Sequence, residues 1–154
     1  MKVIVEDRAQ KAHELFNSGY NCAQAVAAAF ADVLEMDEEY IAQLVSGFGG
    51  GFGRMREVCG AVSGGVFVLN ALFGSFSATD NDAKANHYSL IQELLKAFEK
   101  ECGSYICREL LNLEVKNESP TPELRTEQYY IKRPCGELCE ISAKITANII
   151  NNRI

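Results

Sequence analysis

Apolar residues recur at every third or fourth position along most of the chain, a spacing that places them on one face of a helix. In the segment that follows Pro134, the expected core stripe is Leu138, Ile141, Ile145 and Ile149. The pattern predicts helices over residues 5–16, 22–34, 37–45, 59–72, 80–102 and 105–111, and from 135 onward. We therefore expect an all-α fold, a single-domain bundle of about six to seven helices over residues 1–154.

The segment 59–72 is apolar on nearly all sides, which is typical of a central helix buried on every face. Gly60 and Gly64 share one face of this helix, where another helix or a ligand could come close. A strand is the competing interpretation for residues 66–69. The length of the segment and its Ala and Gly content favour a helix.

Two segments interrupt the helical pattern. Residues 47–53 contain five glycines but lack the Gly-Lys-Ser/Thr of a P-loop, so they are either a tight turn that delivers Cys59 into the core or a cofactor site. Residues 115–133 contain Pro120 and Pro122 and are expected to be irregular. Loops of that length within a compact domain are often functional.

Composition narrows the classes of function. Of 154 residues, 47% are apolar, which is enough to fill one core. The net charge is −6 with no run of Lys or Arg, which argues against nucleic acid and against an anionic membrane surface as partners. No stretch is long and apolar enough for a membrane span, and the N-terminus lacks the pattern of a signal peptide. We therefore expect a cytoplasmic protein.

Six cysteines are the main functional clue. Cytoplasmic thiols are usually kept reduced, so these residues are expected to be catalytic, redox-cycling or metal-binding. Cys22, Cys59 and Cys135 each stand at the predicted start of a helix, where the helix dipole favours a thiolate and lowers the thiol pKa. Arg54 and Arg56 would add positive potential beside Cys59. The competing interpretation is that each cysteine packs as a small hydrophobic side chain.

The spacing of the last two cysteines suits metal binding. Cys135 and Cys139 are four residues apart and share one helix face, as two ligands of one metal would. No CxxC pair is present, which argues against a thioredoxin site and a zinc ribbon.

Several motifs together resemble the redox-active protein family labelled C_GCAxxG_C_C. They are Asn21-Cys22-Ala23-Gln24-Ala25-Val26, Gly49-Gly50-Gly51-Phe52-Gly53-Arg54, Cys59-Gly60-Ala61-Val62-Ser63-Gly64, Cys107-Arg108-Glu109-Leu110-Leu111 and Cys135. The resemblance implies that the four family cysteines are Cys22, Cys59, Cys107 and Cys135, with Cys139 as the alternative for the last. It implies redox activity but no particular substrate. The chain has no CxxCH, which excludes covalent c-type haem.

The leading hypothesis is thiol–disulfide or electron-transfer chemistry, with Cys59 as the attacking thiolate and Cys22 or Cys107 as the resolving thiol. Cys135 completes the expected catalytic set. The enzyme class is undecided beyond a thiol-based oxidoreductase, and the partner would be a redox protein or a small molecule.

Two alternatives come from other classes of protein. The first is a metal or iron–sulfur protein, in which the ligands would be Cys22, Cys59, Cys107, Cys135 and Cys139. The second is a helical scaffold or homodimer that packs through the face of Gly60 and Gly64. The sequence leaves open whether the protein binds a cofactor at all.

Overall fold

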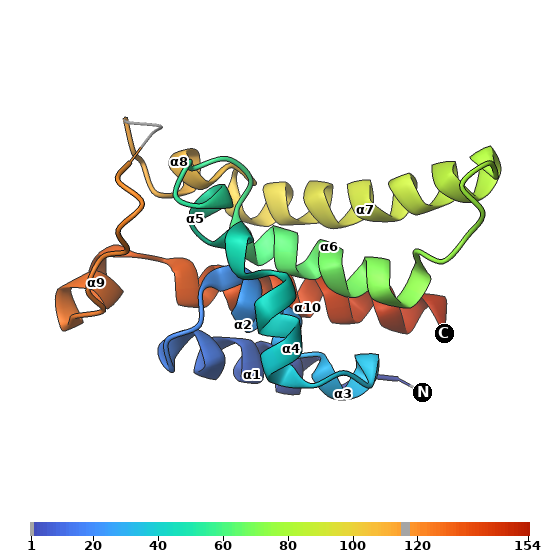
Figure 1. The fold of residues 1–154 in the computed structure, drawn as a ribbon, viewed down its shortest axis with the longest axis horizontal. Coiled ribbons are helices and arrows are strands. Elements are labelled where there is room, and N and C mark those ends of the chain that lie inside the picture. Colours follow the sequence, from blue (N-terminus) through green and yellow to red (C-terminus); the bar gives the residue numbers. More distant parts are fainter. Residues whose placement is uncertain (1, 115–117) are drawn as a thin grey trace.

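The computed structural model describes residues 2–114 and 118–154, which form an all-α fold (Figure 1). The expected fold class is therefore confirmed. In this described part the only β-type pairing is a single antiparallel bridge between Val58 and Ile106. Expectations that concern Met1 or residues 115–117 lie outside the described residues.

The helices follow one another in the order that the apolar pattern predicts, with some additional short ones. They are α1 (Val5–Asn17), α2 (Cys22–Ala28), α3 (Ala31–Leu34), α4 (Glu38–Leu44), the 3-10 helix η1 (Ser46–Phe48), α5 (Gly49–Phe52), α6 (Gly60–Phe73), α7 (Asn81–Cys102), α8 (Cys107–Leu110), α9 (Glu127–Lys132) and α10 (Cys135–Arg153). Within the described ranges, no helix is both long and apolar enough to cross a membrane.

Helix α6 is the central element, as its apolar sequence predicts. It packs against α2, α7 and α10, and it runs between α7 and the layer formed by α1, α2 and α10 (Figure 1). Val62, Val68 and Leu69 of α6 have no solvent exposure. The strand alternative for residues 66–69 is wrong, because these residues continue the helix.

Small residues let α2 lie directly on α6. A Cβ atom at Gly64 would stand 2.6 Å from the Ala23 carbonyl oxygen, and one at Gly60 would stand 3.2 Å from Cys22 Cβ. Any larger side chain at Gly64 would therefore push the two helices apart. The close approach expected at this face is made by α2, and it carries Cys22 to the start of α6.

The predicted helix over residues 22–34 is in fact two helices. Helix α2 ends at Ala28, and the chain turns through Phe30 before α3 begins. The Phe30 side chain is completely buried. We attribute the break to this burial, because a straight continuation of α2 would not turn the ring into the core.

The stripe expected on the last helix is also partly wrong. Leu138 and Ile149 are buried, but Ile141 and Ile145 are only half-buried. Helix α10 packs against α1, α6 and α7, so small residues that fit between helices occupy its buried side. Ser142 is one of them, and its hydroxyl donates to the Ala61 carbonyl at 2.7 Å.

The proline-containing segment is irregular over 118–126 and then forms α9, which the sequence did not predict. Thr126 caps α9 by accepting a hydrogen bond from the Tyr129 backbone N–H. Arg125 fastens the segment to the end of α1, because its guanidinium donates to the carbonyls of Phe16 and Tyr20. Helix α9 projects from one end of the molecule (Figure 1).

Candidate functional site

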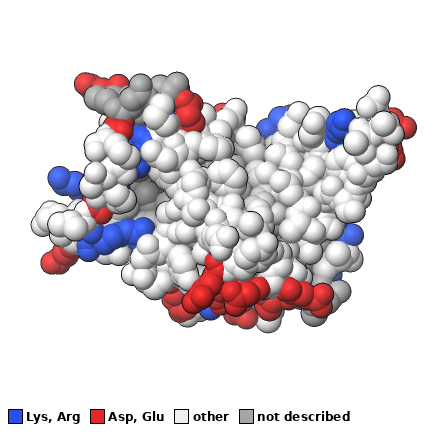
Figure 2. Space-filling view, viewed as in Figure 1, with Lys and Arg blue, Asp and Glu red and all other residues white. Residues whose placement is uncertain are grey.

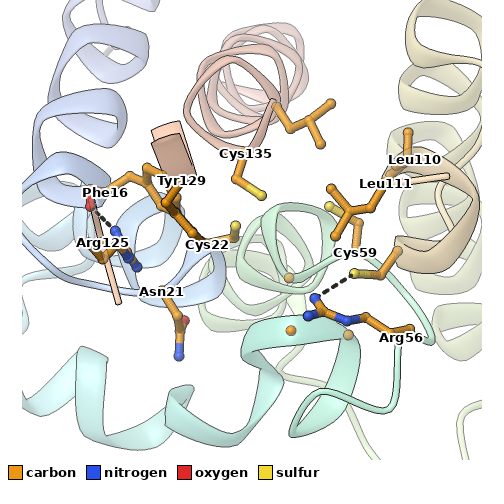
Figure 3. A pocket seen from close by; sticks show the side chains of 15 residues that line it. Phe16, Asn21, Cys22, Arg56, Cys59, Leu110, Leu111, Arg125, Tyr129 and Cys135 are labelled. Carbon is orange, nitrogen blue, oxygen red and sulfur yellow. Dashed lines mark hydrogen bonds between the residues drawn. The ribbon is translucent and has the colours of Figure 1, made fainter. Parts of the chain in front are cut away.

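Four cysteines from distant parts of the chain line one cavity of about 70 Å³. Cys22, Cys107 and Cys135 are the first residues of α2, α8 and α10, and Cys59 is the residue that precedes α6. The side chains of Cys22, Cys59 and Cys135 point toward a common space (Figure 3). The structure thus brings together the four positions that the family resemblance indicates.

A capping box holds Cys22 in place. The Asn21 side-chain oxygen accepts a hydrogen bond from the Gln24 backbone N–H at 2.9 Å, and the Gln24 side-chain oxygen accepts from the Asn21 backbone N–H at 3.0 Å. Both partners lie within four residues of sequence, and the box fixes the first turn of α2 at Cys22. Asn21 also donates to the Ser46 carbonyl at 3.0 Å, which ties α2 to the glycine-rich segment.

The bridge between Val58 and Ile106 brings the two middle cysteines to the cavity. The Cys59 backbone N–H donates to the Tyr105 carbonyl at 2.8 Å, and the Cys107 N–H donates to the Glu57 carbonyl at 2.6 Å. Because the bridge is antiparallel, Cys59 and Cys107 flank it on opposite sides, and both line the cavity. This contact could not be read from the helical pattern, because it pairs two irregular segments.

The glycine-rich segment is a left-handed turn rather than an open loop. Five successive residues, from Gly50 to Arg54, have φ between 60° and 72°. Such angles are unfavourable for residues with a Cβ atom, which explains the glycines at three of these positions. Gly51 lies against the cavity, since a Cβ atom there would stand 2.8 Å from Cys107 Cβ. The tight-turn interpretation is thus confirmed, although the turn packs on Cys107 rather than simply leading to Cys59.

Arg56 places a buried positive charge beside Cys107. Its side chain is buried, and Nη1 lies 3.6 Å from the Cys107 sulfur (Figure 3). Nε and Nη2 each donate to the Glu118 carboxylate at 3.1 Å. From the sequence, this arginine was expected to act on Cys59. The structure corrects that expectation, because the Arg56 guanidinium lies between the Cys107 sulfur and the Glu118 carboxylate.

Burial changes the protonation expected for the cysteines. It raises the pKa of the Cys59 thiol to about 12, although backbone N–H groups at the start of α6 oppose the shift. The predicted low pKa of Cys59 is therefore wrong, because the cost of placing a charge in the core exceeds the effect of the helix end. Burial also raises the pKa of Cys107, with the Arg56 guanidinium acting in the opposite direction.

The Cys22 and Cys135 side chains face each other in the cavity (Figure 3). The neighbouring Cys22 thiol, together with burial, raises the pKa of Cys135 far above that of a free thiol. For Cys22 the Cys135 thiol lowers the pKa, but the Cys139 thiol and desolvation raise it well above its ordinary value, so the low pKa predicted for these two cysteines is wrong as well. The Cys139 thiol also donates to the Cys22 carbonyl at 3.8 Å. The pair is consequently in its neutral dithiol form at neutral pH.

The remaining cysteines differ in their distance from the cavity. Cys139 is buried in α10 behind the Cys22–Cys135 pair and does not contribute to the cavity wall. Cys102, at the end of α7, is half-buried and is not part of the wall either.

Within residues 2–114 and 118–154, no three His, Cys, Asp or Glu side chains are placed so that they could hold one metal ion. The alternative ligand set of Cys22, Cys59, Cys107, Cys135 and Cys139 therefore finds no support in this arrangement.

A second cavity of about 320 Å³ adjoins the cysteine cavity and shares part of its wall, including Cys135, Arg56 and Tyr129. Arg125 and Arg133 line it as well, and Arg133 is paired with Glu123. The sequence patterns did not single out these two arginines or Glu118. The long proline-containing segment supplies Glu118, Glu123, Arg125 and Arg133. Its length was the one sequence feature that suggested a functional role for it.

The fold and the cavity define an all-helical protein with a buried cluster of thiols. The profile of the family described as "Putative redox-active protein (C_GCAxxG_C_C)" matches residues 20–149, so the chain belongs to that family. The match extends from the capping box of α2 to the last turns of α10 and includes the four cysteines of the cavity. Comparisons with curated proteins and with solved structures found no match.

Proposed function

We propose that the protein is a thiol–disulfide exchange protein in which Cys22 and Cys135 form the reactive pair. The observation that carries the proposal is that the Cys22 and Cys135 side chains face each other in a cavity lined by all four family cysteines (Figure 3). Two thiols that face each other across one small cavity can form a disulfide once side-chain rotation brings their sulfur atoms together. The family membership supports redox activity in general.

The proposed reaction is the reduction of a disulfide substrate, R–S–S–R. The Cys135 sulfur, as thiolate, attacks one substrate sulfur, which forms a protein–substrate disulfide and releases one RS⁻. The Cys22 sulfur then attacks Cys135, which forms the Cys22–Cys135 disulfide and releases the second RS⁻. The two cysteine protons pass to the two leaving thiolates. A dithiol reductant returns the pair to its starting state.

Cys135 is assigned the first attack because it lines both cavities and so meets a substrate that arrives through the larger one. Cys107 is the alternative resolving thiol, since Arg56 stabilises its thiolate. Cys59 as the attacking thiolate stays a prediction that this geometry does not favour, because Cys59 lines the smaller cavity but not the larger one.

We also propose that the protein works in a reducing compartment such as the cytoplasm, where Cys22 and Cys135 would both be reduced thiols at rest. A small-molecule or protein disulfide would be the partner. A homodimer packed through Gly60 and Gly64 is not possible in this fold, because α2 covers that face. Homodimer formation through another surface stays a prediction.

The first experiment is intact native mass spectrometry of protein purified without oxygen, repeated after oxidation with a small disulfide and after reduction. We expect the bare chain, a loss of about 2 mass units on oxidation and their return on reduction. Peptide mapping should locate the disulfide between Cys22 and Cys135. A bound metal or cluster in the anaerobic sample, or no disulfide within the cavity, would overturn the proposal.

Matched variants assign the pair. Cys135→Ser and Cys22→Ser should each abolish the reversible loss of about 2 mass units, and Cys22→Ser should instead retain the substrate thiol as a disulfide on Cys135. Cys102→Ser should keep the loss, because Cys102 lies outside the cavity wall. If Cys135→Ser still formed a reversible disulfide at the same rate, the pair would have to be reassigned within the cavity.

A further inference from the structure

The cavity beside the thiols is strongly basic. Four guanidinium groups contribute to its wall, those of Arg54, Arg56, Arg125 and Arg133. Two carboxylates pair with them in the described residues, Glu118 and Glu123. The cavity wall therefore carries more positive than negative groups, although the net charge of the protein is −6.

Figure 2 shows Lys and Arg side chains beside α9 with Asp and Glu side chains among them, and a row of Asp and Glu along the edge formed by α1, α3 and α4. The arginines of the cavity itself, rather than the charge of the whole surface, would therefore attract a small anion.

The chain itself shows that these arginines can hold a carboxylate. Glu118 accepts from Arg54 Nη2 at 2.6 Å and from two nitrogens of Arg56 at 3.1 Å. Arg54 and Arg56 are both largely withdrawn from solvent, which strengthens such charge-assisted bonds. Arg54, the last residue of the left-handed turn, and Arg56, two residues after it, therefore bind one carboxylate together.

The size and the walls suit a small organic molecule rather than a protein segment. The volume of about 320 Å³ lies at the lower end of the range for ligand sites. Pro120, Pro122 and Tyr129 supply apolar surface between the arginines. Cys135 forms the part of the wall that leads to the thiol cavity.

We infer that this cavity binds a small disulfide carrying carboxylate groups and directs its sulfur atoms to Cys135. The inference rests on the proposed function and specifies its substrate class. Arg54 and Arg133 act as binding residues for the carboxylates. The exchange step is the one given above, with a carboxylate-bearing thiolate leaving at each attack.

Binding can be tested apart from redox chemistry with adipate, a dicarboxylate without sulfur. We expect calorimetry to show adipate binding to the reduced protein and to Cys22→Ser/Cys135→Ser alike. Arg133→Gln and Arg54→Gln should each weaken binding by about tenfold, the effect of losing one charge-assisted contact. Arg153→Gln is the matched control, because Arg153 pairs with Glu93 and is not part of the cavity wall.

Glu118→Gln should have the opposite effect to the arginine variants. Removing this carboxylate frees N–H donors of Arg54 and Arg56 and makes the cavity more positive, so adipate should bind more tightly than to the wild type. Circular dichroism of each variant checks that the helices are intact. Binding that is unchanged in all three cavity variants, or equal binding of the neutral 1,6-hexanediol, would overturn the inference.

Substrate preference is tested with three small disulfides of differing charge. The reduced protein should react with 3,3′-dithiodipropionate at least about tenfold faster than with 2-hydroxyethyl disulfide, and more slowly still with cystamine. The preference should fall in Arg133→Gln and at high salt. Equal rates with all three would overturn the inference and leave the proposed function standing. If none reacts while adipate binds, the anion site stands and the thiol–disulfide function fails.

Discussion

Arg56 Nη1 lies 3.6 Å from the Cys107 sulfur, so the buried arginine of the site faces Cys107 rather than Cys59. The same guanidinium binds Glu118 through its other nitrogens. One side chain thus joins the wall of the thiol cavity to the proline-containing segment. The protonation of Cys107 and the position of that segment are coupled through it.

Replacing Arg56 should make Cys107 less reactive. In Arg56→Gln the opposing positive charge is lost while burial remains, so the pKa of Cys107 rises and its alkylation by iodoacetamide at pH 8 slows several-fold. Peptide mass spectrometry after timed alkylation measures the rate at this residue.

Arg54→Gln is the control, because Arg54 binds Glu118 but makes no contact with Cys107 among the described hydrogen bonds. Its Cys107 should react at the wild-type rate. Equal slowing in both variants would show that the effect comes from the loss of Glu118 binding.

A side chain at Gly51 should disrupt the site. In Gly51→Ala the new Cβ would stand 2.7 Å from the Glu57 backbone nitrogen and 2.8 Å from Cys107 Cβ, at a φ of +68°. Steric overlap and backbone strain together should lower the free energy of unfolding by about 3 kcal/mol, measured by urea denaturation.

Gly53→Ala separates the two contributions. Gly53 has a φ of +60°, but a Cβ atom added there would have no atom within 4 Å, so only the strain of about 1 kcal/mol applies. A similar loss in both variants would contradict the close approach of Gly51 to Cys107.

Loss of the capping box should affect both stability and redox chemistry. Asn21→Ala removes the cap of α2 and should cost about 1 kcal/mol in urea denaturation. Because Cys22 is the first residue of this helix, formation of the Cys22–Cys135 disulfide should also slow. Asp37→Ala removes the cap of α4 at a similar cost but should leave that rate unchanged. A slower disulfide in both variants would instead indicate a general effect of stability.

Glu118 should make stability depend on pH in the acid range. Hydrogen bonding from Arg56 lowers the pKa of this carboxyl in the folded state below its ordinary value of 4.5. Its contribution to stability is therefore present above pH 4.5 and is lost as the pH falls through the lower folded value. Glu118→Gln should flatten this part of the stability curve, whereas the exposed Glu99→Gln should not. Parallel curves for the wild type and Glu118→Gln would contradict the ion pair.

Local sequence predicted most of the longer helices. Their ends are set by nearby residues, such as the caps Asn21 and Asp37 and the stop at Gly103, because a helix end depends on residues within about one turn. The break after Ala28 was missed, since it depends on where the Phe30 ring is buried. Helix α9 was missed for a similar reason, because its segment is held in place by Arg125 binding the end of α1.

The sequence by itself determined that the protein is all-α, that its central helix is apolar and that Cys22, Cys59 and Cys135 stand at helix starts. These features follow from the spacing of apolar residues and from capping chemistry, which act over a few residues. Only the tertiary structure decided that Cys22 and Cys135 face each other in one cavity, that Arg56 faces Cys107 and that four arginines share one cavity. The physical reason is that these neighbours come from distant segments, whose meeting depends on the close packing of α2 on Gly64 and on the left-handed turn. Burial in that packed core, which no local pattern specifies, also reversed the pKa expected for Cys59.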